Sequence, residues 1–504
     1  MKVVSAEAMA RIDRLTQAEY VFPSMILMED AGVKAWSAVR RVVWASRAPR
    51  GRHVFVAGRG NNGGDSFVMA RQAAVEGAAP AAIVLAAGRP PADSDPGRML
   101  AMCDTLGIEC VDWLEQRDRA AALVAEADWL FDGIAGTGIH GALQRPQSEV
   151  VERINASRGR KIALDVPSGI GDEFRAGHPA VRADFTLAMG LPKLCLYLPR
   201  TRALCGRILV IPVGFPQALV EDPDIPGELL GPRSWRTLAP YIPPDTHKNK
   251  RGHLAVFAGS SGTTGAAWLC ATAAARSRVG LVTLFIDPDA YPIVAPKLTS
   301  VMCRSWDLTQ GRDRGAWDPA PFSGVLVGPG WGLSEDKARW LDVLLSLPVP
   351  GVLDADALTL LGRGTTRARA DLAGRWVLTP HPGEFARLAG VERDAVLDEP
   401  VKYALETSAA LNAVIVLKGH CTIVASPAGR FWILDAANPA LATAGSGDVL
   451  AGIIAAGVAG GLGPVEAALF GVSLHAHVGR IAARRAGWFL AEDLVPLLSR
   501  VLWQ

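Results

Sequence analysis

The sequence predicts an α/β protein of two domains, and three observations carry that prediction. The chain has 504 residues, which is too long for one ordinary domain and comfortable for two or three. Short apolar runs alternate with helical patterns in both halves, as in doubly wound parallel sheets. Between the halves, residues 214–244 carry seven prolines, so we expect neither a helix nor an inner strand there. The expected domains are residues 1–215 and 241–504, with a linker at 216–240.

Each half supplies its own strands and helices. In the first half, we expect strands at residues 53–57, 81–86, 129–132, 161–165, 184–188 and 207–212, and helices that include 65–76 and 147–156. In the second half, we expect strands at 253–258, 281–286, 324–327, 351–354, 376–379, 413–417 and 422–425. The helices of that half are expected at 264–277, 335–346, 383–389, 446–459 and 464–486.

The composition argues against several classes of function. The chain has 52 basic and 50 acidic residues, so its charge does not point to nucleic acid or to an anionic membrane. The N-terminus lacks the apolar region of a signal peptide. The most apolar run, residues 449–462, is shorter than the roughly 20 residues that span a bilayer, and we expect it to form a buried helix. Seven cysteines without CxxC spacing indicate reduced thiols in a cytoplasmic protein.

A glycine-rich segment, residues 58–65, follows the first expected strand and opens a helix. Glycines let the backbone approach a ligand closely, and a helix N-terminus offers unpaired N–H groups to an anion. The segment is therefore a candidate phosphate or pyrophosphate site, or else a tight turn between strand and helix. The polar side chains of Asn61, Asn62 and Asp65 favour a ligand site, because each needs a partner.

Two further strand ends carry polar and glycine residues, at 132–138 and 165–169. Because ligands of open α/β sheets bind at the carboxyl ends of strands, these loops are expected to meet the first one in a single crevice. Asn62, Asp132 and Ser168 offer the oxygen ligands that alkali and alkaline-earth cations prefer. Asp165 is a candidate general acid or base. Taken singly, each aspartate is more often a helix cap or turn residue.

These motifs, in this order, resemble those of NAD(P)H-hydrate epimerase domains, as do residues 25–32 and 183–186. The resemblance covers residues 1–215 and implies a Rossmann-like three-layer fold that interconverts R- and S-NAD(P)HX, the hydrated forms of NADH and NADPH. It implies that Asp165 is catalytic and that Asn62, Asp132 and Ser168 bind K⁺. The implied hydrate-binding residues are Asn61, Asn62, Gly63, Gly64, Asp65, Gly136, Thr137, Gly138, Ile139, His140, Gly141, Ala142 and Asp165. The chain departs from the family pattern at Asp30, Ser66 and Cys195.

In the second half, residues 444–448 open a long apolar helix with a Gly-x-Gly-Asp motif. Backbone N–H groups at such a turn can form an anion hole, and Asp448 can accept a proton from a hydroxyl that attacks phosphorus. The alternative is structural: Ser446 caps the helix, and Asp448 in its first turn suits the helix dipole. The motif alone leaves both interpretations open.

Polar or glycine-rich junctions follow four other expected strands, at 327–330, 354–358, 379–385 and 417–422. The last of these is typical of a strand–turn–strand with donors for nucleotide phosphates. His381 on its own is more often a structural cap. Folding alone does not readily explain so many polar junctions at one edge of a sheet, so together they favour a ligand site.

These junctions, with residues 247–248, 258–260, 264–266 and 381–388, resemble the ribokinase-like superfamily, and within it the ADP- or ATP-dependent NAD(P)HX dehydratases. The resemblance covers residues 241–504. It implies transient phosphorylation of the hydrate hydroxyl, with Asp448 as base, followed by elimination of phosphate, and it implies Mg²⁺. Hydrate-binding residues would be Ala267, Gly330, His381 and Asp448, and nucleotide-binding residues would be Lys418, Gly419, His420, Cys421, Thr422 and Gly447. Arg278 and Ser446 depart from the family pattern.

The leading hypothesis is thus a bifunctional repair enzyme for NADHX and NADPHX, in which the epimerase half lets both epimers reach the dehydratase half. One alternative is a vitamin or sugar kinase of the ribokinase fold with an accessory nucleotide-binding domain. Another is a nucleotide sensor or scaffold with inactive pockets, although all the expected catalytic residues are present. The sequence does not distinguish ADP from ATP. The family resemblance implies a homo-oligomer.

Overall fold

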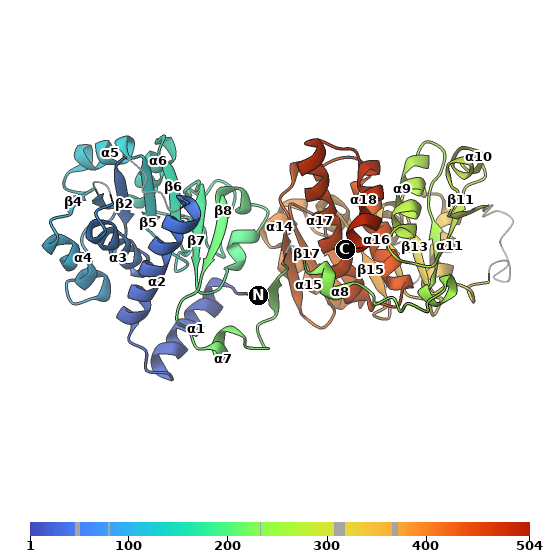
Figure 1. Ribbon diagram of the computed structural model, residues 1–504, viewed down its shortest axis with the longest axis horizontal. Coiled ribbons are helices and arrows are strands. Elements are labelled where there is room, and N and C mark those ends of the chain that lie inside the picture. The colour runs from blue at the N-terminus through green and yellow to red at the C-terminus, as the bar shows by residue number, and fades with distance from the viewer. Residues whose placement is uncertain (46–50, 79–80, 232, 307–317, 365–370, 504) are drawn as a thin grey trace. The chain divides into compact units, whose positions relative to one another are not determined.

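The computed structural model describes residues 1–504 except 46–50, 79–80, 232, 307–317, 365–370 and 504 (Figure 1). The chain divides into two compact units, Met1–Pro226 and Gly227–Gln504. The division falls inside the expected linker. Both units alternate strands with helices, so the prediction of two α/β domains is confirmed.

A parallel seven-stranded sheet forms the centre of the first unit. Its strands, from edge to edge, are β4 (Glu109–Asp112), β3 (Ala81–Leu85), β2 (His53–Ala57), β5 (Trp129–Gly133), β6 (Arg160–Leu164), β7 (Phe185–Met189) and β8 (Arg207–Ile211). Side chains alternate between the two faces of a strand. Accordingly, one face of the sheet packs against α2 (Ser24–Ala38), α3 (Asn61–Val75) and α4 (Asp95–Thr105). The other face packs against α5 (Arg117–Glu126) and α6 (Gln147–Ala156). The unit also contains α1 (Ala6–Ala18).

Two features of the first unit differ from the prediction. The strand β4 was not expected, because its sequence is short and half polar, as suits an exposed edge strand. The helix α3 begins at Asn61 rather than at residue 65, so the glycine-rich segment forms its first turn instead of a separate loop. Propensity disfavours glycine in a helix, but here the close packing of the first turn overrides it.

The second unit contains a mixed sheet that is parallel over most of its width. The strands run in the order β9 (Gly227–Leu229), β18 (Phe431–Asp435), β17 (Cys421–Ala425), β16 (Val414–Leu417), β15 (Trp376–Leu378), β14 (Gly351–Leu353), β13 (Gly324–Val327), β10 (His253–Phe257), β11 (Leu281–Ile286) and β12 (Met302–Ser305). The β16–β17 and β17–β18 pairs are antiparallel and the other pairs are parallel. The edge strand β12 and the strand β18 were not expected.

Helices α9 (Thr264–Ala275), α16 (Ser446–Ala459) and α17 (Pro464–Ala486) pack against one face of this sheet, and α18 (Ala491–Trp503) packs outside them. The helix α16 is buried from Val449 to Ala459, which confirms the buried helix expected there. Other helices of the unit are α11 (Glu335–Leu345), α12 (Ala355–Gly362), α13 (Pro382–Ala389), α14 (Arg393–Asp398) and α15 (Pro400–Leu411). Among the described helices, none is both long and apolar enough to cross a bilayer.

Short elements form within the proline-rich stretch, where neither a helix nor an inner strand was expected. They are α7 (Gln217–Val220), the strand β9 and α8 (Trp235–Leu238). Each is only three or four residues long and fits between prolines. The strand β9 begins directly after Pro226 and pairs with β18. Proline has no N–H donor, but Pro226 lies outside the paired residues, so no hydrogen bond of the ladder is lost.

Candidate functional site

In the first unit, the loops that follow β2, β5 and β6 surround a cavity of about 840 Å³. The parallel order of these neighbouring strands brings their carboxyl ends to one edge of the sheet. Predicted residues that line the cavity are Asn61, Asn62, Asp65, Gly136, Thr137, Gly138, Ile139, His140, Ala142 and Asp165. The lining does not include Gly63, Gly64, Gly141, Asp132 or Ser168. Most of the predicted site is therefore brought together.

The glycines of α3 serve packing. A side chain at Gly63 would collide with the carbonyl group of Gly58, and one at Gly64 would collide with the Met28 side chain. These glycines let the first turn of α3 lie against the end of β2 and against α2. They therefore position Asn61, Asn62 and Asp65 at the cavity without lining it themselves.

A buried hydrogen-bond network joins Asp132 to Ser168. Ser168 donates to Asp132 through its backbone N–H at 2.8 Å and through its hydroxyl at 2.5 Å. The Ser168 hydroxyl in turn accepts the backbone N–H of Ala135 at 2.9 Å. Burial raises the pKa of Asp132 to about 6, although these hydrogen bonds oppose the shift. The network holds the loops after β5 and β6 together beneath the cavity.

Asn62 has a buried amide with no hydrogen-bond partner among the described residues. A buried polar group without a partner is costly, so Asn62 indicates a missing ligand. An amide oxygen, a carboxylate and a hydroxyl are ligands that suit a hard cation. Asn62, Asp132 and Ser168 thus fit the cation that the sequence implies. The hydroxyl of Ser66, one turn further along α3, is also buried without a partner.

Asp165 is held by the last residue of β7 and by a lysine that follows this strand. Its Oδ1 accepts the backbone N–H of Met189 at 3.1 Å and forms an ion pair with Lys193. The Lys193 ammonium, which is 1% exposed, also donates to the carbonyl oxygen of Met189 at 2.5 Å. Asp165 has a φ of +63°, a strained left-handed conformation that is uncommon outside glycine and typical of functional positions.

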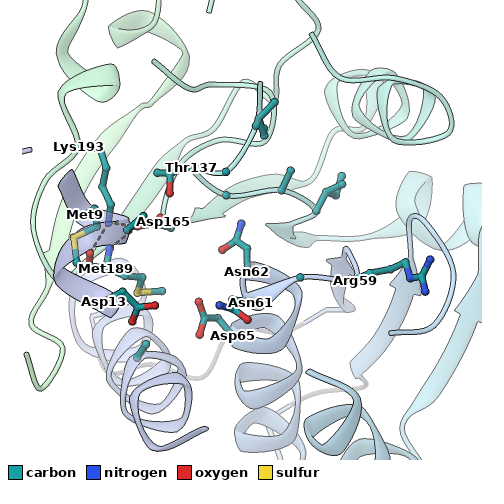
Figure 2. Close-up of a pocket in the computed structure, with 18 of the residues that line it drawn as sticks. Met9, Asp13, Arg59, Asn61, Asn62, Asp65, Thr137, Asp165, Met189 and Lys193 are labelled. Carbon is teal, nitrogen blue, oxygen red and sulfur yellow. Dashed lines mark hydrogen bonds and ion pairs between the residues drawn. The ribbon is translucent and has the colours of Figure 1, made fainter. Parts of the chain in front are cut away.

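Figure 2 shows Asp13, Asp65 and Asp165 pointing into the same space. Burial raises the pKa of Asp65 well above its usual value, and the neighbouring charge of Asp165 adds to the shift. Burial also raises the pKa of Asp13. Asp13 and Lys193 also line the cavity, although their sequence positions were not expected to. The position of Lys193 within the apolar run 191–198 was a usable signal, because an unpaired lysine is seldom buried.

In the second unit, the neighbouring parallel strands β10, β13, β14, β15 and β16 end at one edge of the sheet, as expected. The turn between β16 and β17 contains Lys418, whose Nζ lies 2.9 Å from Asp354 and 3.9 Å from Glu384. Burial opposes the charged form of Lys418, but the two carboxylates outweigh this and raise its pKa. The predicted strand–turn–strand is confirmed, and its lysine already neutralises a buried carboxylate.

Asp448 lies in the first turn of α16, which begins after Gly445 at a φ of +86°. Burial raises the pKa of Asp448 to about 7, with Asp354 adding to the shift and Lys418 opposing it. Ser446 does not cap the helix, because its hydroxyl donates to the carbonyl oxygen of Leu441 at 2.8 Å. The structural alternative for Ser446 is thus wrong, and no side chain caps the first N–H groups of α16.

The other predicted residues of the second unit include a helix cap, a glycine with a positive φ and residues of the β16–β17 turn. His381 caps α13 by accepting N–H groups from Gly383 at 3.0 Å and Glu384 at 3.3 Å, and its side chain remains half exposed. Gly330 adopts a φ of +55°, and its carbonyl oxygen accepts the Thr263 hydroxyl at 2.7 Å. Three further predicted residues lie in or beside the β16–β17 turn, namely Gly419, His420 and Thr422.

Three residues named from the sequence are set back from the open edge. Ala267 and the Cys421 side chain are buried. Arg278, one of the departures from the family pattern, donates to the carbonyl oxygens of Pro240 and Leu502 and therefore ties peripheral segments together. Gly447 lies close to Lys418: a Cβ atom placed on it would be 3.5 Å from Lys418 Nζ.

Two α/β units, each with buried carboxyl groups and glycine-containing loops at the carboxyl edge of its sheet, define the class of two-domain α/β enzymes. The family model of the YjeF-related protein N-terminus matches residues 24–195, and that of NAD(P)H-hydrate dehydratase matches residues 254–500. The chain belongs to the family of bifunctional NAD(P)H-hydrate repair enzymes, in which an epimerase domain is joined to a dehydratase domain.

Curated relatives match along nearly the whole chain. The bifunctional NAD(P)H-hydrate repair enzyme Nnr of Moorella thermoacetica is 37% identical over 100% of this chain and 97% of its own length. The enzyme of the same name from Escherichia coli K12 is 30% identical over 94% of this chain and 89% of its own length. A ribokinase-like superfamily protein from Enterococcus faecalis V583 has a TM-score of 0.50 at 24% identity, covering 55% of this chain and 95% of its own. The last match is a likeness of fold.

Proposed function

We propose that the first half of this chain interconverts R- and S-NAD(P)HX, and that the second half dehydrates S-NAD(P)HX to NAD(P)H at the expense of ADP or ATP. The observation that carries this proposal is a pair of carboxyl groups, Asp165 and Asp448, one at the carboxyl edge of each sheet. Each has a largely buried lysine nearby, Lys193 for Asp165 and Lys418 for Asp448.

Asp448 would accept the proton of the hydrate hydroxyl while that oxygen attacks the terminal phosphorus of the nucleotide. Its pKa of about 7 leaves much of the carboxylate ionised at neutral pH and basic enough to accept a proton. The uncapped N–H groups at the start of α16, including that of Gly447, would hold the transferred phosphoryl group. Loss of phosphate, together with a ring proton, then restores the double bond of the nicotinamide.

The turn between β16 and β17 would hold the nucleotide. Since Cys421 is buried and the Lys418 ammonium is paired with Asp354, we expect the backbone N–H groups of residues 418–422 to supply most of the contacts with phosphate. The Mg²⁺ ion would be held mainly by phosphate oxygens, because the described part of the chain contains no cluster of three His, Cys, Asp or Glu side chains that could bind a metal. Ala267, Gly330 and His381 would lie nearest the hydrate.

In the first half, Asn62, Asp132 and Ser168 would hold K⁺. The support is the unpartnered Asn62 amide, together with the Asp132–Ser168 network that fixes the loops next to it. The cation would supply positive charge beside a buried carboxylate and would hold the loop 134–142 in place for the hydrate. Asp165 would act as the acid or base of the epimerisation.

The test supplies mixed NADHX epimers with Mg²⁺ and either ADP or ATP, and follows NADH by its absorbance. The wild-type chain should convert both epimers. Asp448→Asn should form NADH about 100-fold more slowly or worse, and Asp165→Asn should convert only the S fraction. A wild-type yield limited to the S fraction would argue against a working epimerase half. Accumulation of a stable phosphorylated alcohol would favour a vitamin or sugar kinase instead. Titration of both nucleotides identifies the donor, and light scattering tests whether the protein is the homo-oligomer that we expect.

A further inference from the structure

We propose that Lys193 is a positioning residue of the first site, which fixes Asp165 as the proton acceptor and so leaves Asp65 as its partner acid. This inference rests on the proposed epimerase function and assigns proton-transfer roles within it. Asp65 was expected only to bind the hydrate, and Lys193 was not expected at the site.

In the part of the chain that the structure describes, the Asp165 carboxylate is bound through only one of its two oxygens. Both of its donors, the Lys193 ammonium and the Met189 N–H, bind the same oxygen, Oδ1. Within the described residues, Oδ2 takes part in no hydrogen bond, and Asp165 lines the cavity. The carboxylate is thereby held with one oxygen tied down and the other available to a ligand.

Lys193 is a buried lysine at the wall of the cavity. Its side chain is 1% exposed, so its charge is screened little by solvent. An ammonium has three donors, and two of them are directed at Asp165 and at the carbonyl oxygen of Met189. A buried lysine that only stabilised the fold would not need to line the cavity, yet Lys193 does. Its ammonium therefore holds the Asp165 carboxylate in an ion pair at the cavity wall.

Asp65 differs from Asp165 in its position and in its partners. This carboxyl group projects from α3, whereas Asp165 follows β6, so the two face the cavity from different elements (Figure 2). Asp65 has no ion pair among the described residues. Burial opposes its ionisation most, the negative charges of Asp165 and Asp13 add to this, and the Lys193 charge only partly offsets them, so the pKa of Asp65 stays well above its usual value. Two carboxyl groups in one cavity, one ion-paired with a lysine and the other buried without an ion pair, are typical of an acid–base pair.

Such a pair can invert the carbon that carries the added hydroxyl group. Asp65 gives its proton to the hydroxyl oxygen, and the C–O bond breaks with its electron pair on oxygen, so that water leaves. The ring nitrogen lone pair stabilises the resulting cation. Water then adds to the opposite face of the same carbon, and Asp165 accepts the proton released. The reverse conversion starts from this protonation state and runs the same steps backwards, so no further reagent is needed.

The experiment compares Lys193→Met and Lys193→Arg in the full-length enzyme. The two NADHX epimers are separated by chromatography, and epimerisation is measured from pH 5 to pH 9. Lys193→Met should lower kcat about 100-fold, a typical general acid–base contribution, with KM changed less than about threefold. The acid limb of its pH–rate profile should move to higher pH. Lys193→Arg keeps the charge, so it should retain that limb and recover at least about a tenth of the wild-type rate.

Dehydration of purified S-NADHX by the second half serves as the control within each variant and should be unchanged. A Lys193→Met enzyme with wild-type kcat and an unshifted pH profile would overturn the inference while leaving the epimerase function intact. Absence of epimerisation in the wild type would instead overturn the proposed function. If Lys193→Met fails to fold, Lys193→Arg tests the inference. Its pH profile should match that of the wild type, and a different profile would overturn the inference.

Discussion

The Lys418 ammonium lies 2.9 Å from the carboxylate of Asp354, a residue that is 1% exposed at the end of β14. The same oxygen of Asp354 accepts the Thr379 hydroxyl at 2.8 Å. One buried carboxylate thus links the ends of three neighbouring strands, β14, β15 and β16. The ion pair fixes the edge of the sheet that faces Asp448.

Replacing Lys418 with methionine should leave Asp354 buried without a counter-charge. Breaking a buried pair in this way costs about 3–5 kcal/mol, so the free energy of unfolding should fall by that amount and dehydration should be lost. The double variant Asp354→Asn/Lys418→Met should regain much of the stability but not the activity. As a control, Lys402→Met removes an exposed pair with Glu399 and should change stability by less than about 1 kcal/mol in chemical unfolding. Equal losses for both lysines would contradict the assignment.

The pKa of Asp448, about 7, predicts the pH dependence of dehydration. A base must be deprotonated to act, so kcat/KM for dehydration, which reports the pKa of the free enzyme, should rise with pH through about 7 and then level off. Asp448→Asn should lower the rate by about 100-fold or more and remove this limb, while epimerisation by the first half continues. The measurement is the pH profile of NADH formation from S-NADHX. An unchanged limb in Asp448→Asn would assign the titration to another group.

Much of the fold could be predicted because local patterns and tertiary packing agree. The alternation of apolar runs with helical patterns placed most strands within a residue or two, and α16 and α17 have the bounds expected from sequence. Three of the missed strands, β4, β9 and β12, have only three or four residues and weak apolar patterning. Their pairing is decided by the neighbouring strand more than by their own residues.

Site residues could be predicted where a sequence motif marks them and not where contacts between distant segments place them. Motifs at strand ends indicated Asp165 and Asp448, because parallel topology brings such ends together. Lys193 and Asp13 come from segments without a motif, and their role follows only from contacts between distant parts of the chain. The packing roles of Gly63 and Gly64 could not be predicted either. A glycine-rich turn has the same sequence whether its backbone approaches a ligand or another helix.

His53 predicts a pH dependence of stability. It is fully buried at the start of β2, stacks on Trp44 at 5.1 Å, and neither ring nitrogen has a hydrogen-bond partner among the described residues. Burial lowers the pKa of His53 from 6.5 to about 4, so the unfolded chain binds more protons between these values. This contribution to the free energy of unfolding is present above pH 6.5 and is lost as the pH falls towards 4, by up to about 3 kcal/mol. His53→Phe should remove that loss, measured as the difference in unfolding free energy from wild type at each pH.

Potassium should stabilise the first unit through Asn62. Replacing Asn62 should weaken K⁺ binding more than replacing either of the other two ligands. The Asn62 amide has no other partner among the described residues, whereas Asp132 and Ser168 are hydrogen-bonded to each other. At a K⁺ concentration about ten times its Kd, binding to the folded state alone adds about 1.4 kcal/mol to the free energy of unfolding. Melting curves in KCl and in tetramethylammonium chloride, at equal ionic strength, measure this directly. Asn62→Ala should abolish the difference between the two salts, and the matched change at its exposed neighbour, Asn61→Ala, should preserve it. If Asn62→Ala still responds to K⁺ as the wild type does, the cation binds elsewhere.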